Sequence, residues 1–413
     1  MAASRSTREI APVQIEIPVR LRKVCFALCA MNLMLCLMAY LAGVWIHDRN
    51  GLGIPVDFIQ IPAAGRLALD GFAAQVFDSD ILKRMEVAKL GQDFAGNFPW
   101  QYPPPFLFIA SLLALLPYSV ALLGWVLASI LPYVAVIRAI VAHNFGVMLA
   151  LAVPFVFINT LAGQNGFLTA ALIGGTLYLI PIRPVLAGIC LGLLTYKPQF
   201  GLLFPIVLIA AGHWRVFASA SMTAIALFVV SWLAFGTESW LAFVDNLPRL
   251  QVSLTEGKAL MGRMQSIYSM VRYFGGTEQL GWAFQFILTA SVAVVLALMW
   301  RSRVPYAWKA AALAAGTLLA TPYLFMYDMV VLAIPVAFLV RIGLKTGFRG
   351  YELPALGGAL VLIAVNFIIY DGKRGAGAPM GVGVTLIVSI LILARAGSWW
   401  RRERAPAAVV AGA

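Results

Sequence analysis

Long apolar runs separated by polar turns follow one another along almost the whole chain. Several of these runs are longer than the ~10 residues that a strand of a membrane barrel needs, and the longest approach the ~20 residues with which a helix crosses a bilayer. The pattern therefore predicts an all-α, polytopic membrane protein. The thirteen runs lie near residues 24–46, 104–117, 119–141, 145–162, 165–181, 183–196, 199–212, 216–235, 281–300, 307–320, 325–341, 353–370 and 379–396.

The composition agrees with a protein dissolved in lipid. Of the 413 residues, 62% are hydrophobic and 11% are charged, whereas a soluble domain carries roughly 25% charged residues. The first run follows Arg20, Arg22 and Lys23 and is too long for the core of a signal peptide, so we interpret it as a retained anchor. The four cysteines all fall within apolar runs, which indicates buried thiols and no disulfide framework.

Basic residues concentrate in one set of turns, and the positive-inside rule places that set in the cytoplasm. The set comprises both termini, the turns at Arg138, Arg183 and Arg215, and the turns 301–309 and 341–352. The net charge of +13 therefore reports the topology and requires no nucleic-acid partner.

Two cytoplasmic termini require an even number of crossings, so one of the thirteen runs does not cross. The run 104–117 is short and opens with "YPPPF". We expect it to be a half-helix or a re-entrant segment, which leaves about twelve transmembrane helices.

The predicted organisation is a single integral membrane domain, residues 24–398, between a cytoplasmic N-terminal segment, 1–23, and a cytoplasmic tail, 399–413. Two long stretches, 47–103 and 236–280, lie on the outer side of a multi-pass protein of the cytoplasmic membrane. The apolar content of the first stretch favours short helices lying in the membrane interface.

Unusual polar residues at the ends of the runs all fall on the outer face under this topology. Polar groups next to hydrocarbon cost free energy unless they are paired or used, so their gathering on one face indicates a site there. These residues are Asp57, Tyr102, Gln164 and Asn165 in "AGQNGF", Lys197 in "TYKPQF", and Tyr323 and Asp328 in "ATPYLFMYD".

Each of these residues also has an ordinary interpretation. Asp57 is either a helix N-cap or a carboxylate whose pKa is raised by apolar neighbours, as suits a general base. Lys197 either snorkels to water or neutralises a phosphate. The glycines around Gln164 and Asn165 indicate a tight turn, in which Gln164 is free to bind a polyol. Asp328 is either functional or paired with an Arg or Lys.

The sequence gives little support to metal or cofactor chemistry. Asp78 and Asp80 form a D-x-D pair that can hold a divalent cation, but short acidic pairs are common, and we predict no metal site. The three histidines lack partners at metal-ligand spacing, and no nucleotide-binding loop, G-x-S-x-G or H-E-x-x-H motif is present. We therefore expect no cofactor.

Taken in order, several segments resemble glycosyltransferase family 87, the polyprenyl-phosphate-mannose-dependent α-mannosyltransferases of the GT-C class. The resemblance covers about residues 55–340. Its segments are "VDFIQIPAAGRLALDG" with "VFD", "WQYPPPFLF", "AGQNGFLTAAL", "RPVLAGICLGLLTYKPQFGLLFP" and "ATPYLFMYDMVVLAIP".

The resemblance implies a GT-C-like fold with its catalytic face outward, a polyprenyl-phosphate sugar as donor, and a lipid or glycan as acceptor. By position it makes Asp57 the general base of an inverting single displacement. In one respect the chain departs from the family, since Tyr323 stands where better-studied members carry a histidine; this puts mannose in doubt. The residues expected to bind substrate are Tyr102, Gln164, Asn165, Lys197, Tyr323 and Asp328.

Two other classes of protein compete with this interpretation. A transporter or flippase of lipid-linked sugars would show inverted repeats and polar residues near the middle of its spans, and neither is visible. A polymerase or ligase acting on preassembled glycans would also use external basic and acidic residues, and only the family resemblance argues against it.

Overall fold

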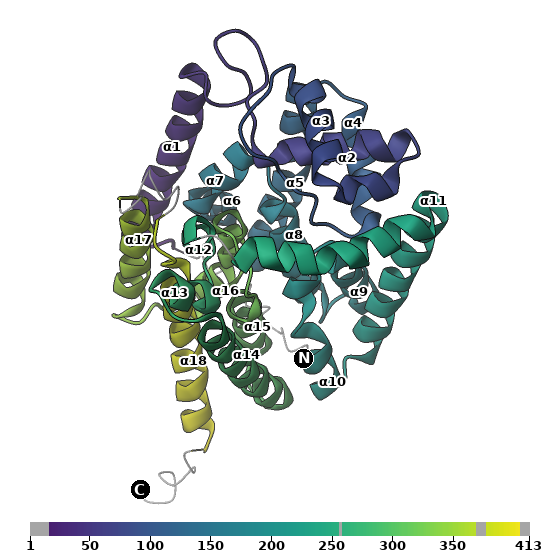
Figure 1. Cartoon of the computed structure of the whole chain (residues 1–413). Coiled ribbons are helices and arrows are strands. Elements are labelled where there is room, and N and C mark those ends of the chain that lie inside the picture. Colours follow the sequence, from purple (N-terminus) through teal and green to yellow (C-terminus); the bar gives the residue numbers. More distant parts are fainter. Residues whose placement is uncertain (1–15, 256–257, 369–376, 405–413) are drawn as a thin grey trace, which may run out of the picture.

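The computed structural model describes residues 16–255, 258–368 and 377–404, and within these ranges the chain is helical and contains no β-strand (Figure 1). The α-helices are α1 (Val19–Leu41), α2 (Gln60–Leu69), α3 (Ser79–Leu90), α4 (Leu107–Ala114), α5 (Tyr118–Val141), α6 (Phe145–Ala152), α7 (Phe155–Ala162), α8 (Gly166–Leu179), α9 (Pro184–Leu193), α10 (Phe204–Ala210), α11 (Trp214–Thr255), α12 (Lys258–Arg263), α13 (Ile267–Tyr273), α14 (Glu278–Arg301), α15 (Tyr306–Ala320), α16 (Ala333–Thr346), α17 (Glu352–Ile368) and α18 (Gly381–Arg404). The 3-10 helices are η1 (Asp57–Ile59), η2 (Ala73–Phe77), η3 (Pro104–Phe106), η4 (Leu194–Tyr196), η5 (Pro198–Gly201) and η6 (Met326–Leu332).

Every one of the thirteen apolar runs contains a helix, which confirms an all-α, polytopic membrane protein. Among the described residues, six helices are long and apolar enough to cross a membrane: α1, α5, α11, α14, η6 with α16, and α18. The pair α6 and α7 counts as a seventh span if its 68° bend is accepted within one crossing. Several other apolar helices are shorter than a bilayer is thick, so the expected count of about twelve crossings stays a prediction.

The first helix lies several residues nearer the N-terminus than its apolar run. It begins at Val19 and so includes the basic residues before the run, whose long side chains can reach water from within a helix. It ends at Leu41, because Gly43 takes a positive φ of 67° and turns the chain away.

A sharp bend divides α11 into two limbs (Figure 1). Gly236 lies at the bend with a φ of 77°, in a region that disfavours residues with a side chain. The first limb packs against α9. The second limb contacts η2, since the ring of Phe243 lies 5.9 Å from that of Phe77. The predicted run 216–235 ends where the bend occurs, so the second limb is part of the outer stretch.

The stretch 47–103, which is predicted to lie on the outer side, folds as a small helical layer at one end of the molecule, far from the C-terminal end of α18 (Figure 1). Its α2 packs directly on the eight-residue helix α4. A Cβ on Gly65 would lie 2.0 Å from the carbonyl oxygen of Ala110, so the two helices touch through their backbones. Most side chains of α2 are buried, which makes this layer a packed part of the protein.

The centre of the bundle is formed by α8, α15 and α16, in which most residues are buried. A Cβ on Gly174 in α8 would lie 2.6 Å from Val136 and 2.7 Å from Ile334. Small residues thus bring α5, α8 and α16 close together, as is usual for helices packed in lipid.

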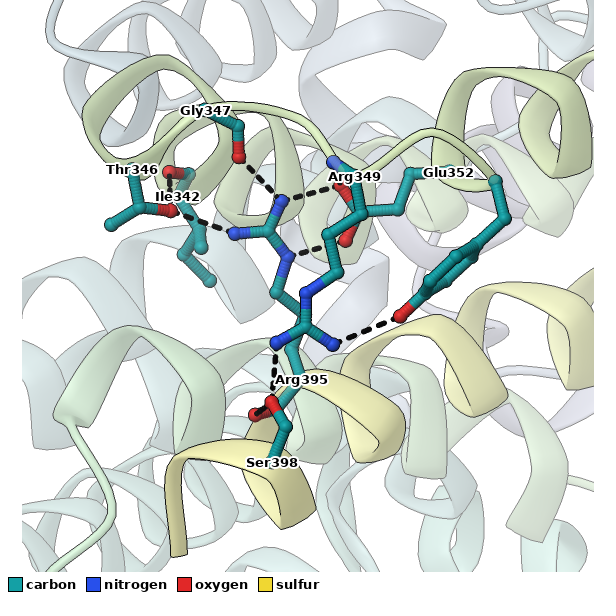
Figure 2. A network of polar contacts seen from close by, with 8 residues as sticks. Ile342, Thr346, Gly347, Arg349, Glu352, Arg395 and Ser398 are labelled. Atoms are coloured by element: carbon teal, nitrogen blue, oxygen red, sulfur yellow. Dashed lines mark hydrogen bonds and ion pairs between the residues drawn. The ribbon is translucent and has the colours of Figure 1, made fainter. Parts of the chain in front are cut away.

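A buried polar network joins the C-terminal part of α18 to the turn between α16 and α17 (Figure 2). Arg395 in α18 forms an ion pair with both carboxylate oxygens of Glu352 and donates hydrogen bonds to Thr346 Oγ1 (2.7 Å) and to the carbonyl oxygen of Gly347 (2.7 Å). The backbone N–H of Arg349 donates to Glu352 Oε2 at 2.9 Å. The charges of Arg395 and Glu352 compensate each other, and this pair fixes α18 to the turn between α16 and α17.

Candidate active site

The turn between α7 and α8 joins two segments that are distant in the sequence. Gly163 has a φ of 61°, and a Cβ there would lie 2.6 Å from Cβ of Phe58. A Cβ on Gly166 would lie 2.6 Å from the carbonyl oxygen of Tyr327. The glycines are therefore needed for close backbone approach, and each contact lies one residue from a predicted site acid.

Gln164, in this turn, bridges a carboxylate and a phenol. Its Nε2 donates to Asp57 Oδ2 at 3.2 Å, and its Oε1 accepts from Tyr102 OH at 3.1 Å. The three side chains come from η1, from the turn and from the segment before η3. Gln164 is buried and both ends of its amide are bonded, so the side chain is held in one orientation.

Asp57 is not a helix cap. It is the first residue of η1, whose N-cap position is Val56, and no side chain caps that helix. The carboxyl is partly buried, and this burial raises its pKa above the ordinary value. The hydrogen bond from Gln164 and the positive charges of Arg263 and Lys197 act in the opposite direction. The expected direction of the pKa shift is therefore found, and its cause is desolvation.

Lys197 and Asp328 form a buried ion pair. Lys197 Nζ lies 2.6 Å from Asp328 Oδ1, and the two side chains are only 7% and 2% exposed. The snorkelling interpretation of Lys197 is therefore wrong, because the ammonium group is held inside the protein. The ordinary interpretation of Asp328, pairing with a basic residue, is confirmed, and the partner is itself a predicted site residue.

A cavity of about 320 Å³ lies beside the ion pair of Lys197 and Asp328. Four of the predicted residues line it: Tyr102, Lys197, Tyr323 and Asp328. Asp57 is not in the cavity wall. It is hydrogen-bonded to Gln164, which in turn accepts a hydrogen bond from the lining residue Tyr102. The remaining lining residues are Gln101, Pro103, Tyr196, Pro198, Gln199, Phe243, Leu247, Phe325 and Tyr327.

Tyr323 belongs to an aromatic group at the rim of this cavity. Its ring lies 6.2 Å from that of Tyr268 and 5.9 Å from that of Trp282, in both cases edge to face. Burial raises the pKa of Tyr323 to about 12, so its hydroxyl is neutral and acts as a hydrogen-bonding group. The backbone N–H of Gln265 donates a hydrogen bond to the carbonyl oxygen of Leu324, which lies between the lining residues Tyr323 and Phe325.

Asn165 supports the site through its backbone. Its carbonyl oxygen accepts hydrogen bonds from Thr169 Oγ1 (3.1 Å) and from Tyr196 OH (3.3 Å). Its buried side-chain amide makes no hydrogen bond of ordinary geometry with the described residues. The amide lies beside the Tyr102 hydroxyl, whose ionised form it would favour, so it belongs to the same polar cluster as Gln164.

Three residues of the site were not among the predicted catalytic and substrate-binding residues. Tyr196 and Tyr327 line the cavity, and Arg263 contributes positive charge at Asp57. Tyr196 immediately precedes Lys197, and Tyr327 immediately precedes Asp328. This proximity in the sequence is the only feature from which their place in the site could have been predicted. Arg263 lies in the second outer stretch, where nothing in the spacing distinguishes it from its basic neighbours.

Asp78 serves as the N-cap of α3, and its Oδ1 accepts from the backbone N–H groups of Asp80 (2.9 Å) and Ile81 (3.0 Å). The D-x-D pair thus has a structural explanation. Within the described ranges, no three His, Cys, Asp or Glu side chains are grouped so that they could hold a metal ion.

Comparison with known proteins gives one match. The model of glycosyltransferase family 87 matches residues 100–322, more than half of the chain. The matched region includes Tyr102, Gln164, Asn165 and Lys197, whereas Asp57, Tyr323 and Asp328 lie outside it. No curated protein and no solved structure matches.

Proposed function

Because the chain belongs to glycosyltransferase family 87, and is therefore a membrane glycosyltransferase, we propose that it transfers a hexose from a polyprenyl-phosphate sugar to an acceptor hydroxyl on a lipid or glycan. Mannose is the first sugar to test. The observation that carries the proposal is a cavity lined by a buried cation, Lys197, with a carboxylate, Asp57, joined to the cavity wall by the hydrogen bonds from Gln164 to Asp57 and from Tyr102 to Gln164. We place this cavity on the outer face of the cytoplasmic membrane.

Asp57 is the proposed general base. Gln164 occupies Oδ2, which leaves Oδ1 to accept the proton of the acceptor hydroxyl. The acceptor oxygen, as it loses this proton, attacks the anomeric carbon while the bond from that carbon to the phosphate oxygen breaks. The electron pair leaves with the polyprenyl phosphate, the proton stays on Asp57, and the configuration at the anomeric carbon is inverted. A base with a raised pKa is suited to this step because it accepts the proton more readily.

Lys197 is the proposed contact for the phosphate. Its charge is balanced by Asp328, and a phosphate entering the cavity competes with that carboxylate for the ammonium group. Polyprenyl phosphate is already a good leaving group, so a positive charge is more useful here than a proton donor. Tyr323 can add a hydrogen bond but no charge.

An apolar groove supports a lipid-linked donor. It lies among α1, α6, α7, α16, α17 and α18, and its walls are made almost entirely of aliphatic side chains. The short helix η6 connects it with the site, because Asp328 lies near the start of η6 and Leu332, at its end, lines the groove. A polyprenyl chain has the chemistry to fill this groove, whereas a nucleotide does not.

The test measures sugar transfer by the purified full chain in lipid. The donor is radiolabelled polyprenyl-phosphate mannose, with a nucleotide sugar in a parallel reaction and host lipid extract as the acceptor source. We expect transfer only from the lipid-linked donor. Asp57→Asn should lower the rate by about 10²–10⁴-fold, the usual contribution of a general base.

Asp70→Asn is the matched control, since Asp70 lies in the same outer stretch but forms an exposed ion pair with Arg66 at 2.7 Å. It should transfer at the wild-type rate. Equal activity of Asp57→Asn and the wild type would exclude Asp57 as the base. A folded wild-type protein that transfers from no lipid-linked hexose would favour a transporter of such lipids.

A further inference from the structure

A second polar cavity lies at the opposite end of the bundle from the active site. It has a volume of about 620 Å³. Two central elements connect the two places: α8 begins beside Asn165 and ends at the cavity, and η6 with α16 begins near Asp328 and also ends there. The second of these elements is long enough to cross a membrane, so the cavity lies at the other membrane interface.

Two cations lie in the wall of this cavity. Arg341 and Lys345 are one helical turn apart on α16. Arg341 donates one hydrogen bond, from Nη1 to the carbonyl oxygen of Ile140 at 3.1 Å. No Asp or Glu is among the residues that line the cavity in the described part of the chain. The nearby acid Glu352 is already bound by Arg395 (Figure 2). The cavity therefore carries uncompensated positive charge.

The rest of the wall is apolar and aromatic. Phe338 and Ile342 contribute aliphatic and aromatic surface from the same helix as the cations. Tyr178, Trp308 and Trp399 surround them from α8, α15 and α18. Tyrosine and tryptophan are typical of the headgroup level of a bilayer. The cavity thus combines positive charge with an apolar wall at the depth where lipid headgroups lie.

We propose that this cavity binds the headgroup of an anionic phospholipid of the leaflet opposite the active site, with the phosphate between Arg341 and Lys345 and part of an acyl chain along the apolar wall. A phosphodiester offers oxygens to both cations at once. Basic pockets between transmembrane helices are a known means of holding such headgroups.

Two simpler explanations of the cations account for only part of the structure. Basic residues in the last turn of a helix interact favourably with its dipole, and they mark the cytoplasmic side of a membrane protein. Both effects operate equally on cations that point into open water. Neither explains why Arg341 and Lys345 share a cavity with several tyrosine and tryptophan side chains and, among the described lining residues, no acid.

The test is native mass spectrometry of the delipidated full chain, titrated with phosphatidylglycerol or with phosphatidylcholine of the same acyl chains. The wild type should retain phosphatidylglycerol in preference to phosphatidylcholine. The double variant Arg341→Gln/Lys345→Gln should bind phosphatidylglycerol about tenfold to thirtyfold more weakly, since each cation near a membrane surface contributes about 1 kcal/mol. Glutamine at 341 keeps a donor for the carbonyl oxygen of Ile140, which protects the fold.

Arg215→Gln is the matched control, because Arg215 is a basic residue of another cytoplasmic turn and does not line the cavity. It should retain phosphatidylglycerol as the wild type does. Equal retention by the double variant, or equal binding of the two lipids by the wild type, would overturn the proposal. Competition by millimolar inorganic phosphate without any need for acyl chains would identify a soluble anion as the ligand, and would overturn it as well.

Discussion

Asp57 is subject to two opposing effects on its pKa. Burial among apolar neighbours disfavours its charge, while Gln164, Arg263 and Lys197 favour it. Burial is the larger effect, so the pKa lies above the ordinary value for aspartate. The proposed base works only when it is ionised, so we expect the rate to be lost as the pH falls through this raised pKa.

The pH dependence of kcat/KM tests this argument. The wild type should show an acidic limb of unit slope, with its midpoint above the ordinary pKa of aspartate, about 3.9. Gln164→Leu removes a hydrogen bond that lowers the pKa of Asp57, so the midpoint should move to higher pH. Both profiles are measured between pH 4 and 9 with the lipid-linked donor, and a Gln164→Leu profile that coincides with the wild-type profile would contradict the assignment.

At the scale of elements, the turn 163–166 determines where the site residues meet. Its two glycines let the turn touch the side chain of Phe58, beside Asp57, on one side and the backbone of Tyr327, beside Asp328, on the other. The break between α6 and α7 gives α7 its own direction, and this turn follows at its end. The geometry of the site therefore depends on backbone contacts that tolerate no added atom.

Gly166→Ala is expected to damage the site. The new Cβ would lie 2.6 Å from the carbonyl oxygen of Tyr327, so η6 would have to move. Overpacking of this kind costs about 1–3 kcal/mol, and we expect at least a tenfold loss of transfer with a lower melting temperature. Gly124→Ala in α5 is the control, because nothing lies within 4 Å of its added Cβ. Equal activity of the two variants would show that the close contact does not matter.

The helices could be predicted because an apolar run long enough to approach a membrane span leaves the backbone no alternative to internal hydrogen bonds. Their internal breaks were harder. The run 145–162 was interpreted as one segment, although Pro154 within it disfavours a continuous helix. The extent of α11 beyond Gly236 could not be predicted, because its second limb is too polar to show the apolar pattern.

At the scale of the whole molecule, the sequence indicated which residues share a face but not which ones touch. Successive turns lie on alternate faces of the membrane in the predicted topology, which places Lys197 and Asp328 at the same face. Both were proposed as site residues for this reason. Their ion pair joins residues 131 positions apart, and neither spacing nor composition identifies such a partner. The bridge from Asp57 through Gln164 to Tyr102 depends on packing in the same way.

The proposed sidedness can be measured with single cysteines in a background that lacks the four native ones. Asp93→Cys lies in the outer stretch 47–103, where the side chain is exposed, and Arg303→Cys lies in the basic turn after α14. In intact cells a membrane-impermeant maleimide should label position 93 and not position 303. Permeabilised cells should show labelling at both positions. Labelling of position 303 alone in intact cells would reverse the orientation.

The ion pair of Lys197 and Asp328 has a consequence for inhibitor design. A compound that copies only the sugar leaves this pair intact and gains no electrostatic contribution from Lys197. An anionic compound must displace the carboxylate of Asp328, which is almost completely shielded from water. Useful anions will therefore be those that also offer Asp328 a donor, such as an amine or hydroxyl beside the phosphate mimic. On the proposed assignment of Lys197 to the donor phosphate, a pharmacophore for this site begins with an anion for Lys197 and a donor for Asp328.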